Sequence, residues 1–244
     1  MSEKWSILIL TQPGREQFLA RLHAVLRPQL EAHSDVKLTI HSFDRSKDLG
    51  TNRQGMIERA EGEFISWIDD DDLVPANYVS TIYPLLDGVD YVGFQLQMYI
   101  DGVKQKPTFH SLRYKEWTGD EQGWYRDISH LNPIRRKLAL TIPMSGGNGE
   151  DSRWADGLRK LGIVKKEHYV DAVMYLYLYR SNKMSPTVPR TPLATSRTDP
   201  VHDPNAATHF PVGHRRPICP KCGSTACGIA GGMRRCNQCG ASWI

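Results

Sequence analysis

Cysteine is absent from most of this 244-residue chain, and all five cysteines lie between positions 219 and 239. A disulfide-stapled secreted protein distributes its cysteines through its core, so this clustering favours metal binding instead. The chain also lacks an apolar run of the roughly 20 residues that cross a bilayer. Its N-terminal sequence lacks the apolar segment of a signal peptide. These absences predict a soluble, cytoplasmic protein that is not inserted in a membrane.

The charge is distributed unevenly along the chain. Residues 183–244 carry eight Lys/Arg and two Asp, a net charge of +6, whereas the whole chain carries only +4, which leaves −2 for positions 1–182. A basic C-terminal segment beside an acidic body indicates an anionic partner, although a tail that only increases solubility has the same composition. The length suits one catalytic domain plus a small appendage.

Four consecutive aspartates, Asp69 to Asp72, follow a short apolar run, Phe64–Ile68, that is typical of a buried strand. Four like charges repel each other unless a positive group lies among them. A hard divalent cation, Mg²⁺ or Mn²⁺, meets this requirement and keeps coordination positions open for phosphate oxygens. Ligands of open α/β sheets bind beyond the carboxyl ends of strands, where these aspartates would lie. A solvated acidic turn is the alternative interpretation.

Strand and helix patterns alternate from Trp5 to Leu85. The predicted elements are strands at Trp5–Thr11, Val36–Phe43 and Phe64–Ile68, and helices at Arg15–Glu31, from Thr51 to Ala60, and from Pro75 onward. This alternation predicts a mostly parallel, Rossmann-like sheet flanked by helices. Both glycine-rich phosphate fingerprints are missing, so a cation would have to neutralise any diphosphate. Further on, Asp101-Gly102 predicts a hairpin turn between two strands.

A glycine-rich stretch, Met144–Gly149, delivers Glu150 and Asp151 to the start of a predicted helix. Flexibility before an acidic pair is what a substrate-covering loop needs. The helix dipole also favours a carboxylate at this position, so either residue could simply cap the helix. Residues 110–132 are polar and aromatic, and they could either line a site or pack as an ordinary loop.

Four motifs between positions 1 and 182 resemble those of family 2 glycosyltransferases of the GT-A fold, in the family's order. They are Ile9-Leu10-Thr11 with Arg15, Ala60–Ile65, Ile68–Asp72 with Pro75, and Gly149-Glu150-Asp151 with Arg159 and Gly162. The resemblance implies a metal-dependent transfer of a sugar from a nucleotide-sugar to an acceptor hydroxyl, with inversion. A uridine diphosphate sugar is the leading expectation for the donor.

The same resemblance implies roles for individual residues. Asp71 and Asp69 would hold Mn²⁺ or Mg²⁺ against the departing diphosphate. Asp151 would act as general base, with Glu150 raising its pKa and so making it more basic. The remaining nucleotide-sugar-binding positions would be Thr11, Arg15, Asp44, Arg53, Asp69 and Asp70, with Asp70 near the ribose. The family's "DDxS" and Arg-Asn-x-Gly patterns are altered here, to Ser42–Ser46 and Asn52–Gly55.

Two CxxCG knuckles, which begin at Cys219 and Cys236, give the C-terminal segment the pattern of a zinc ribbon. The expected structural Zn²⁺ ligands are Cys219, Cys222, Cys236 and Cys239, and Cys227 is left over. So short a domain has almost no core, and zinc is expected to be required for its folding. The predicted domains are therefore a GT-A domain at 1–182, a proline-rich linker at 183–217 and a zinc ribbon at 218–244.

The acceptor is expected to be a macromolecule. The basic charge near the ribbon favours nucleic acid carrying a hydroxylated base, and a protein such as a capsid protein is the alternative acceptor. The layout is reminiscent of phage-encoded transferases, which would place the protein in the host cytoplasm. Two other functions fit clustered aspartates or basic charge: a metal-dependent nucleotidyl or phosphoryl transferase, and a non-catalytic nucleic-acid-binding protein. The ribbon could equally be a structural or oligomerising module.

Overall fold

The computed structural model describes residues 2–181, together with short strands at 227–230, 233–236 and 242–243. The chain divides into two compact units, residues 1–203 and 204–244. The described strands of the second unit, β10 (Cys227–Ala230), β11 (Met233–Cys236) and β12 (Ser242–Trp243), form an antiparallel sheet in which Cys227 pairs with Cys236. The predicted linker and the expected zinc ligands Cys219, Cys222 and Cys239 lie outside the described residues.

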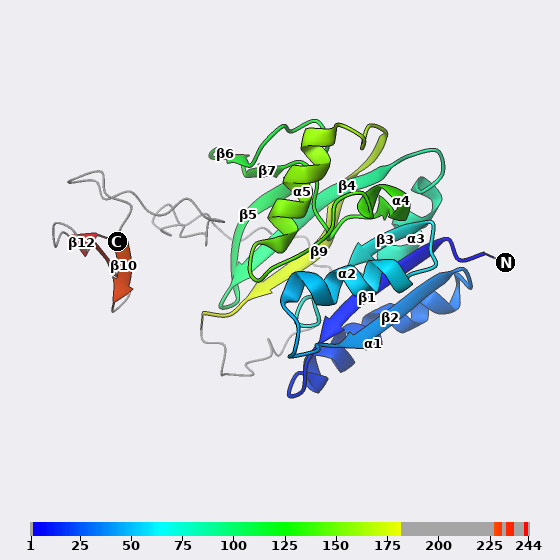
Figure 1. Ribbon diagram of the computed structural model, residues 1–244, viewed down its shortest axis with the longest axis horizontal. Helices are drawn as coiled ribbons and strands as arrows, with labels where there is room; N and C mark the ends of the chain where they lie inside the picture. The colour runs from blue at the N-terminus through cyan, green and yellow to red at the C-terminus, as the bar shows by residue number, and fades with distance from the viewer. Residues whose placement is uncertain (1, 182–226, 231–232, 237–241, 244) are drawn as a thin grey trace, which may run out of the picture. The chain divides into compact units, whose positions relative to one another are not determined.

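A nine-stranded sheet forms the centre of the first unit (Figure 1). Its strands are β1 (Trp5–Thr11), β2 (Val36–Ser42), β3 (Phe64–Trp67), β4 (Tyr91–Ile100), β5 (Val103–His110), β6 (Thr118–Gly119), β7 (Trp124–Arg126), β8 (Ile134–Arg135) and β9 (Glu167–Tyr179). Their order is β2-β1-β3-β8-β4-β5-β7-β6, and β9 pairs with β4.

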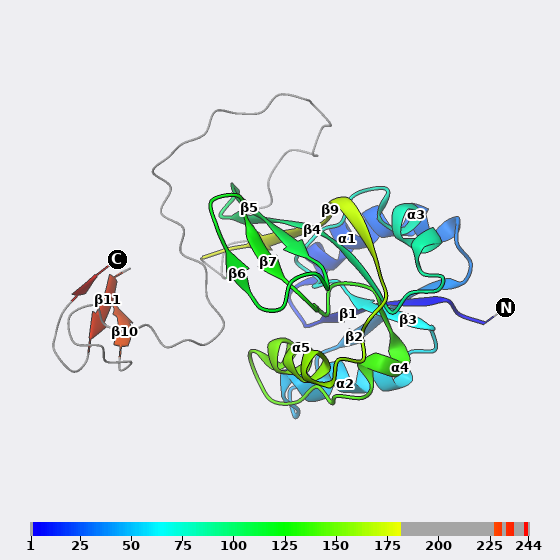
Figure 2. The same ribbon diagram turned by 90° about the horizontal axis from the view of Figure 1, so that it is seen from above.

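Helices cover both faces of this sheet, so the first unit has three layers (Figure 2). One face carries α1 (Glu16–Glu31), α3 (Tyr78–Ile82) and the 3₁₀ helix η1 (Tyr83–Leu85), and the other carries α2 (Leu49–Arg59), α4 (Arg136–Ala139) and α5 (Glu150–Leu161). Successive residues of a strand point to opposite faces. In β1, Ile7 and Ile9 therefore pack with α1 and α3, while Leu8 packs with α2 and α5. This two-sided burial explains the continuous apolar run of the strand.

The sheet is mixed, and its longest pairings are parallel, in line with the predicted mostly parallel sheet. β1 pairs in parallel with β2 and β3, as predicted from the alternating strands and helices. Beyond β3, β4 pairs with β9 and β5 pairs with β7 in parallel. The pairings of β8 with β3 and β4, of β5 with β4, and of β6 with β7 are antiparallel. The β4–β5 connection is the predicted Asp101-Gly102 hairpin, with both residues at positive φ. The very short β8 carries no periodic signal, so its insertion between β3 and β4 could not be predicted.

Helix α2 is docked against the glycine-rich loop before α5. It begins at Leu49, earlier than predicted, because the Asp48 side chain and not Thr51 caps it: Asp48 Oδ1 accepts a bond from Thr51 N at 2.7 Å. Gly50 N donates to Gly146 O at 2.8 Å. A Cβ on Gly50 would lie 2.5 Å from backbone atoms of Ser145. Only glycine allows this close approach of the two backbones.

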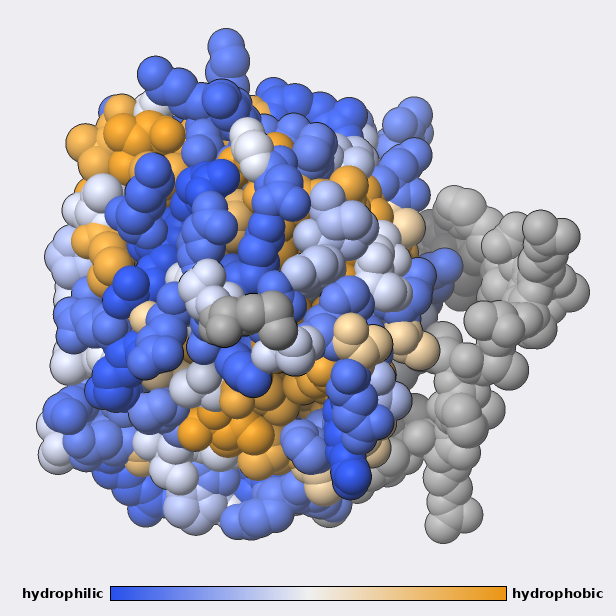
Figure 3. All heavy atoms as spheres, turned by 90° about the vertical axis from the view of Figure 1, so that its right-hand side faces the viewer, coloured by the Kyte–Doolittle hydropathy of each residue, from blue (hydrophilic) through white to orange (hydrophobic). Residues whose placement is uncertain are grey.

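The face of the molecule near the N-terminus is mostly hydrophilic, with separate hydrophobic areas (Figure 3). Among the helices that the structure describes, none combines the length and the apolar character needed to span a membrane.

Replacing Gly50 with alanine is expected to destabilise the first unit by about 1–3 kcal/mol, because the new methyl group overpacks against the Ser145 backbone. The matched control is Gly55→Ala in the same helix. A Cβ there meets only the flexible end of Arg59, so the variant should gain about 0.5–1 kcal/mol of helix stability. Urea unfolding measures both values, and equal effects of the two substitutions would contradict the close approach.

Candidate active site

The carboxyl ends of β1 and β3 lie at the same edge of the sheet because the two strands are parallel neighbours. Thr11 is the last residue of β1 and Arg15 follows that strand, while the aspartates follow β3. Thr11 Oγ1 donates to Asp70 Oδ2 at 2.6 Å, and Arg15 Nη2 lies 2.8 Å from Asp70 Oδ1 and 2.5 Å from Asp71 Oδ2. The structure thus brings together two of the sequence motifs that were predicted to share a site.

Arg53 connects this edge to the start of α5. Its Nη1 lies 2.6 Å from Glu150 Oε1 and its Nη2 lies 2.8 Å from Asp69 Oδ1. The side chains of Arg53 and Glu150 are 9% and 2% exposed, so this is a buried ion pair. A buried charge is tolerated only when it is paired, and Arg53 pairs with a carboxylate from each motif.

Arginines supply positive charge among the four aspartates. From the sequence, a bound divalent cation was the leading candidate to offset their repulsion. In the described structure Arg15 contacts Asp70 and Asp71, and Arg53 contacts Asp69. Arg15 and Arg53 therefore supply part of the positive charge that we had expected from a metal ion.

Asp72 is turned away from the other aspartates and anchors β9. Its Oδ2 accepts a bond from the Tyr175 hydroxyl at 2.9 Å, and its Oδ1 accepts from Leu178 N at 2.7 Å. The same hydroxyl accepts a bond from Asp69 N at 3.0 Å. Tyr175 thus fixes both ends of the aspartate turn, and Asp72 has a structural role.

The acidic run is divided into buried and exposed carboxylates. Asp70 is held inward with 3% of its side chain exposed, whereas Asp69 and Asp71 are 33% and 35% exposed. Burial raises the pKa of Asp70 to about 6, even though Thr11 and Arg15 lower it. Burial also raises the pKa of Asp69 and Asp72, and the neighbouring aspartates add to both shifts.

Asp151 lies at the start of α5, where Gly149 adopts a left-handed φ of 84° just before the helix. Its Oδ2 lies 3.4 Å from His130 Nδ1 and 3.7 Å from Arg126 Nη2. Burial raises the pKa of this carboxyl, but the neighbouring His130, Arg126 and Arg53 outweigh burial and lower the pKa to about 2.

The expectation that Glu150 raises the pKa of Asp151 is therefore wrong. Glu150 points to Arg53, which neutralises its charge. The pKa of Glu150 is itself raised, chiefly by burial and despite Arg53. The sequence could not show this, because the two neighbouring carboxylates find different partners in the fold.

Asp44 lies beyond the end of β2 and closes its own turn. Its carboxylate accepts bonds from Ser46 N at 3.0 Å and Ser46 Oγ at 2.6 Å, and Lys47 Nζ lies 3.0 Å away. These bonds lower the pKa of Asp44 to about 2. The buried Asn52 holds the loop by bonding to both backbone groups of Asp44. The structure does not join the Asp44 carboxylate to the other site residues through any described contact.

Two further arginines lie near this edge, and sequence reasoning missed them. Arg21 Nη2 donates to the Asp71 carbonyl at 2.9 Å, and the Arg180 guanidinium lies 4.5 Å from the centre of the Phe18 ring. Arg15 lies 5.9 Å from the same ring. Neither Arg21 nor Arg180 forms an ion pair with another described residue. Their charges are thus available to an anion.

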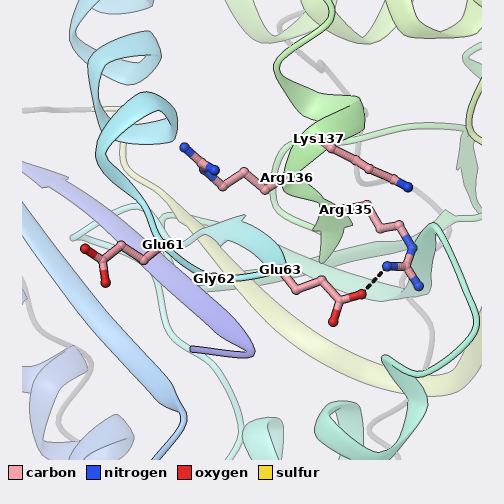
Figure 4. A pocket seen from close by; sticks show the side chains of 6 residues that line it. All are labelled: Glu61, Gly62, Glu63, Arg135, Arg136 and Lys137. Carbon is pink, nitrogen blue, oxygen red and sulfur yellow. Dashed lines mark hydrogen bonds and ion pairs between the residues drawn. The ribbon is translucent and has the colours of Figure 1, made fainter. Parts of the chain in front are cut away.

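A hollow of about 300 Å³ lies at the other end of β3 from the aspartates (Figure 4). Glu61, Gly62 and Glu63 line it together with Arg135, Arg136 and Lys137. Arg135 pairs with Glu63, and Arg136 bonds to the carbonyls of Ile57 and Glu58. Both arginines already have partners, so we do not assign this hollow to the site. No group of three or more His, Cys, Asp or Glu arranged to hold a metal occurs among the described residues.

Comparisons with known proteins address the family of the chain. Residues 22–147, just over half of the chain, match the family described as "Glycosyl transferase family 2". This stretch includes Arg53, the four aspartates and His130, and it ends shortly before Glu150. A search of curated proteins gave no match.

The fold is similar to that of solved structures of S. aureus TarS. TarS 1–349 shares 15% sequence identity at a TM-score of 0.50, over 72% of this chain and 60% of that chain. TarS 1–349 in complex with UDP-GlcNAc shares 15% sequence identity at a TM-score of 0.51, over 74% of this chain and 60% of that chain. The chain thus spans only about 60% of the length of these structures. At this identity the likeness shows the fold alone, and it confirms the predicted GT-A fold.

Arg53→Met should destabilise the first unit by about 3–5 kcal/mol, because it leaves Glu150 buried without its partner. Arg59→Met, at an exposed position in the same helix, should change stability by no more than about 0.5 kcal/mol. Urea unfolding measures both variants. An Arg53 variant as stable as the Arg59 variant would show that the buried bridge contributes nothing.

The contribution of Asp70 to stability should fall as the pH rises through its pKa. The folded pKa is about 6 and the ordinary value is 3.8, so the folded state binds this proton more tightly. The resulting stabilisation is complete below pH 3.8, the ordinary pKa, and is lost as the pH rises above the folded pKa of about 6. For a shift of this size it is on the order of 2–3 kcal/mol. Asp69 and Asp72 act in the same direction, because their pKa values are also raised.

Urea midpoints measured in EDTA at pH 4.5 and 7.5 test this expectation. Burial lowers the pKa values of His110 and His130, which act in the opposite direction, so the share of Asp70 is read from the variant. Relative to wild type, Asp70→Asn should be less stable at pH 4.5 than at pH 7.5. Identical differences in the two proteins would contradict the raised pKa of Asp70.

Proposed function

Because the chain belongs to glycosyl transferase family 2, we propose that it transfers a sugar from a nucleotide-sugar donor to an acceptor hydroxyl. One observation carries the proposal: Arg53 contacts both Asp69, at the end of β3, and Glu150, which is adjacent to Asp151. A group that binds a diphosphate and a group that accepts a proton must lie near one anomeric carbon. The Arg53 bridge supports that arrangement.

The donor is a uridine diphosphate sugar under this proposal. The similar TarS structure in complex with UDP-GlcNAc supports this choice of nucleotide. Thr11, Arg15, Arg53, Asp69 and Asp70 surround the sheet edge where the nucleotide would bind, and we retain Asp44 as a candidate for the base because it follows β2 at the same edge.

A divalent cation, Mn²⁺ or Mg²⁺, fits the two exposed carboxylates. Asp69 and Asp71 are each about one third exposed, and their oxygens are the hard donors that these cations prefer. When bound, the cation offsets the negative charge of a leaving diphosphate. Arg21 and Arg180 would add to this compensation, because both lie near this edge without an acidic partner in the described structure.

Asp151 is the proposed general base. The carboxylate is ionised at neutral pH, which is the form that accepts a proton, and its lowered pKa, about 2, makes it a weaker base than an ordinary aspartate. A single base that takes the acceptor proton as the acceptor oxygen attacks the anomeric carbon accounts for an inverting reaction. Glu150 acts indirectly, by holding Arg53 in the site.

The acceptor is proposed to be a macromolecule, with nucleic acid favoured over protein because residues 183–244 carry a net charge of +6. A hydroxylated DNA base in a phage system fits this charge.

We also propose that Cys219, Cys222, Cys236 and Cys239 bind a structural zinc, on the spacing of their two CxxCG knuckles. Only Cys236 of this set lies within a described strand, β11.

A screen of sugar nucleotides by thermal shift with Mn²⁺ identifies the donor, because a bound ligand raises the melting temperature. With that donor, Asp151→Asn should slow release of the free nucleoside diphosphate by about 10²–10⁴-fold and leave the donor Kd unchanged. Asp71→Ala should weaken donor binding and its dependence on Mn²⁺ together. Asp87→Ala, at an exposed surface position, is the control. Normal turnover by the Asp151 variant would overturn the base assignment.

A further inference from the structure

We infer that His130 is a positioning residue for Asp151: its Nδ1–H donates to Asp151 Oδ2, so that Oδ1 is the oxygen that receives the proton of the acceptor hydroxyl. The inference rests on the proposed function of Asp151 as the base. The 3.4 Å between His130 Nδ1 and Asp151 Oδ2 is the observation behind it. Nothing in the sequence motifs of the family resemblance pointed to this histidine.

The fold holds the His130 backbone firmly at the end of β3. The His130 carbonyl accepts a bond from Trp67 N at 3.1 Å, just before the first aspartate. Next to it, Ser129 N donates to the Tyr91 hydroxyl at 3.1 Å, and that hydroxyl donates to the Asp127 carbonyl at 3.2 Å. These bonds fix a short loop that carries no regular secondary structure, and they set where the imidazole lies.

The imidazole is buried, yet neither ring nitrogen has a hydrogen-bond partner among the described residues. The side chain is only 7% exposed, and its ring meets the edge of Trp67 at 6.0 Å between centroids. A buried polar group without a partner costs about 1–3 kcal/mol, so its presence calls for a reason. Hydrogen bonds at active sites are often long or poorly aligned until substrate binds, and the 3.4 Å contact can then shorten.

The charges around His130 favour an uncharged ring with one N–H. Burial lowers its pKa well below the ordinary value, and Arg53, Arg126 and His110 lower it further, while Asp151 alone opposes them. These four groups come from α2, β7, β5 and α5, the elements that surround the ring. An uncharged imidazole carries a single N–H, and that N–H is useful to Asp151 only on Nδ1.

Two N–H groups from the buried side face one oxygen of Asp151, and the Ser152 hydroxyl faces the other. Arg126 Nη2 lies 3.7 Å from the same Oδ2 that faces His130. The Ser152 hydroxyl donates to Oδ1 at 3.5 Å, a long bond that an arriving acceptor hydroxyl can replace. Asp151 remains 21% exposed, so an acceptor can reach it. Fixing Oδ2 from the buried side orients Oδ1 toward the solvent side, where the hydroxyl would arrive.

Substitutions of His130 with Asn and Gln distinguish a role that depends on the Nδ1–H from a role in packing alone. The amide nitrogen of Asn can occupy the place of Nδ1, whereas the longer Gln places its amide near Nε2. With the donor from the thermal-shift screen and Mn²⁺, His130→Ala and His130→Gln should lower kcat for nucleoside diphosphate release by about 10–100-fold with KM unchanged. His130→Asn should retain most of the wild-type rate. Equal rates for the Asn and Gln variants would overturn the inference.

A second measurement does not depend on turnover. Nitrogen-15 NMR of histidine-labelled protein at neutral pH reports which ring nitrogen of His130 carries the proton. We expect the Nδ1–H tautomer in wild type and in Ser152→Ala, and the Nε2–H tautomer in Asp151→Ala. An Nε2–H or a doubly protonated ring in wild type would overturn the inference. If the wild-type protein binds no donor but carries the proton on Nδ1, the proposed function is wrong and the His130–Asp151 hydrogen bond is still supported.

Discussion

The buried guanidinium of Arg53 is the interaction on which the site depends. Its two carboxylate partners come from different parts of the chain, Asp69 after β3 and Glu150 at the start of α5. A charge in the interior must be fully compensated, so moving either element away would leave a charge unpaired. This requirement holds the helix that carries Asp151 against the strand end that carries the aspartates. The close contact of Gly50 with the loop before α5 supports the same geometry.

The four aspartates, Asp69 to Asp72, have different roles although their side chains are chemically identical. Asp72 is bonded to Tyr175 and the backbone of β9, and Asp70 is held by Thr11 and Arg15. Asp69 and Asp71 stay partly exposed at the sheet edge. The four residues form a turn closed by a bond from Asp72 N to the Asp69 carbonyl at 3.0 Å, in which Asp70 and Asp72 are buried. Burial raises the pKa of Asp69, Asp70 and Asp72, and the partly exposed pair keeps the oxygens that a cation can reach.

Local patterns predicted the elements that depend on local signals. β1 has the predicted boundaries, Trp5–Thr11, and Asp101-Gly102 forms the predicted turn, because apolar runs and turn residues act over a few positions. The very short β8 and its antiparallel place between β3 and β4 were not predictable. Such a short strand exists only because its neighbours supply the hydrogen bonds. In the site, the sequence pointed to the aspartates and the Glu150-Asp151 pair, but not to Arg180. Residues 110–132, which include Arg126 and His130, were predicted either to line a site or to pack as an ordinary loop.

The sequence by itself determined which residue types could do chemistry and the order in which the motifs occur, since both are properties of short stretches of chain. Only the tertiary structure decided which charges meet. Arg53 and Glu150 are 97 positions apart, and their contact gives Glu150 a partner and leaves Asp151 to His130 and Arg126. The pKa of Asp151 is consequently lowered, whereas its sequence neighbour alone would have raised it. Electrostatic interactions act through space, and the spatial neighbours of a side chain are fixed only when the chain has folded.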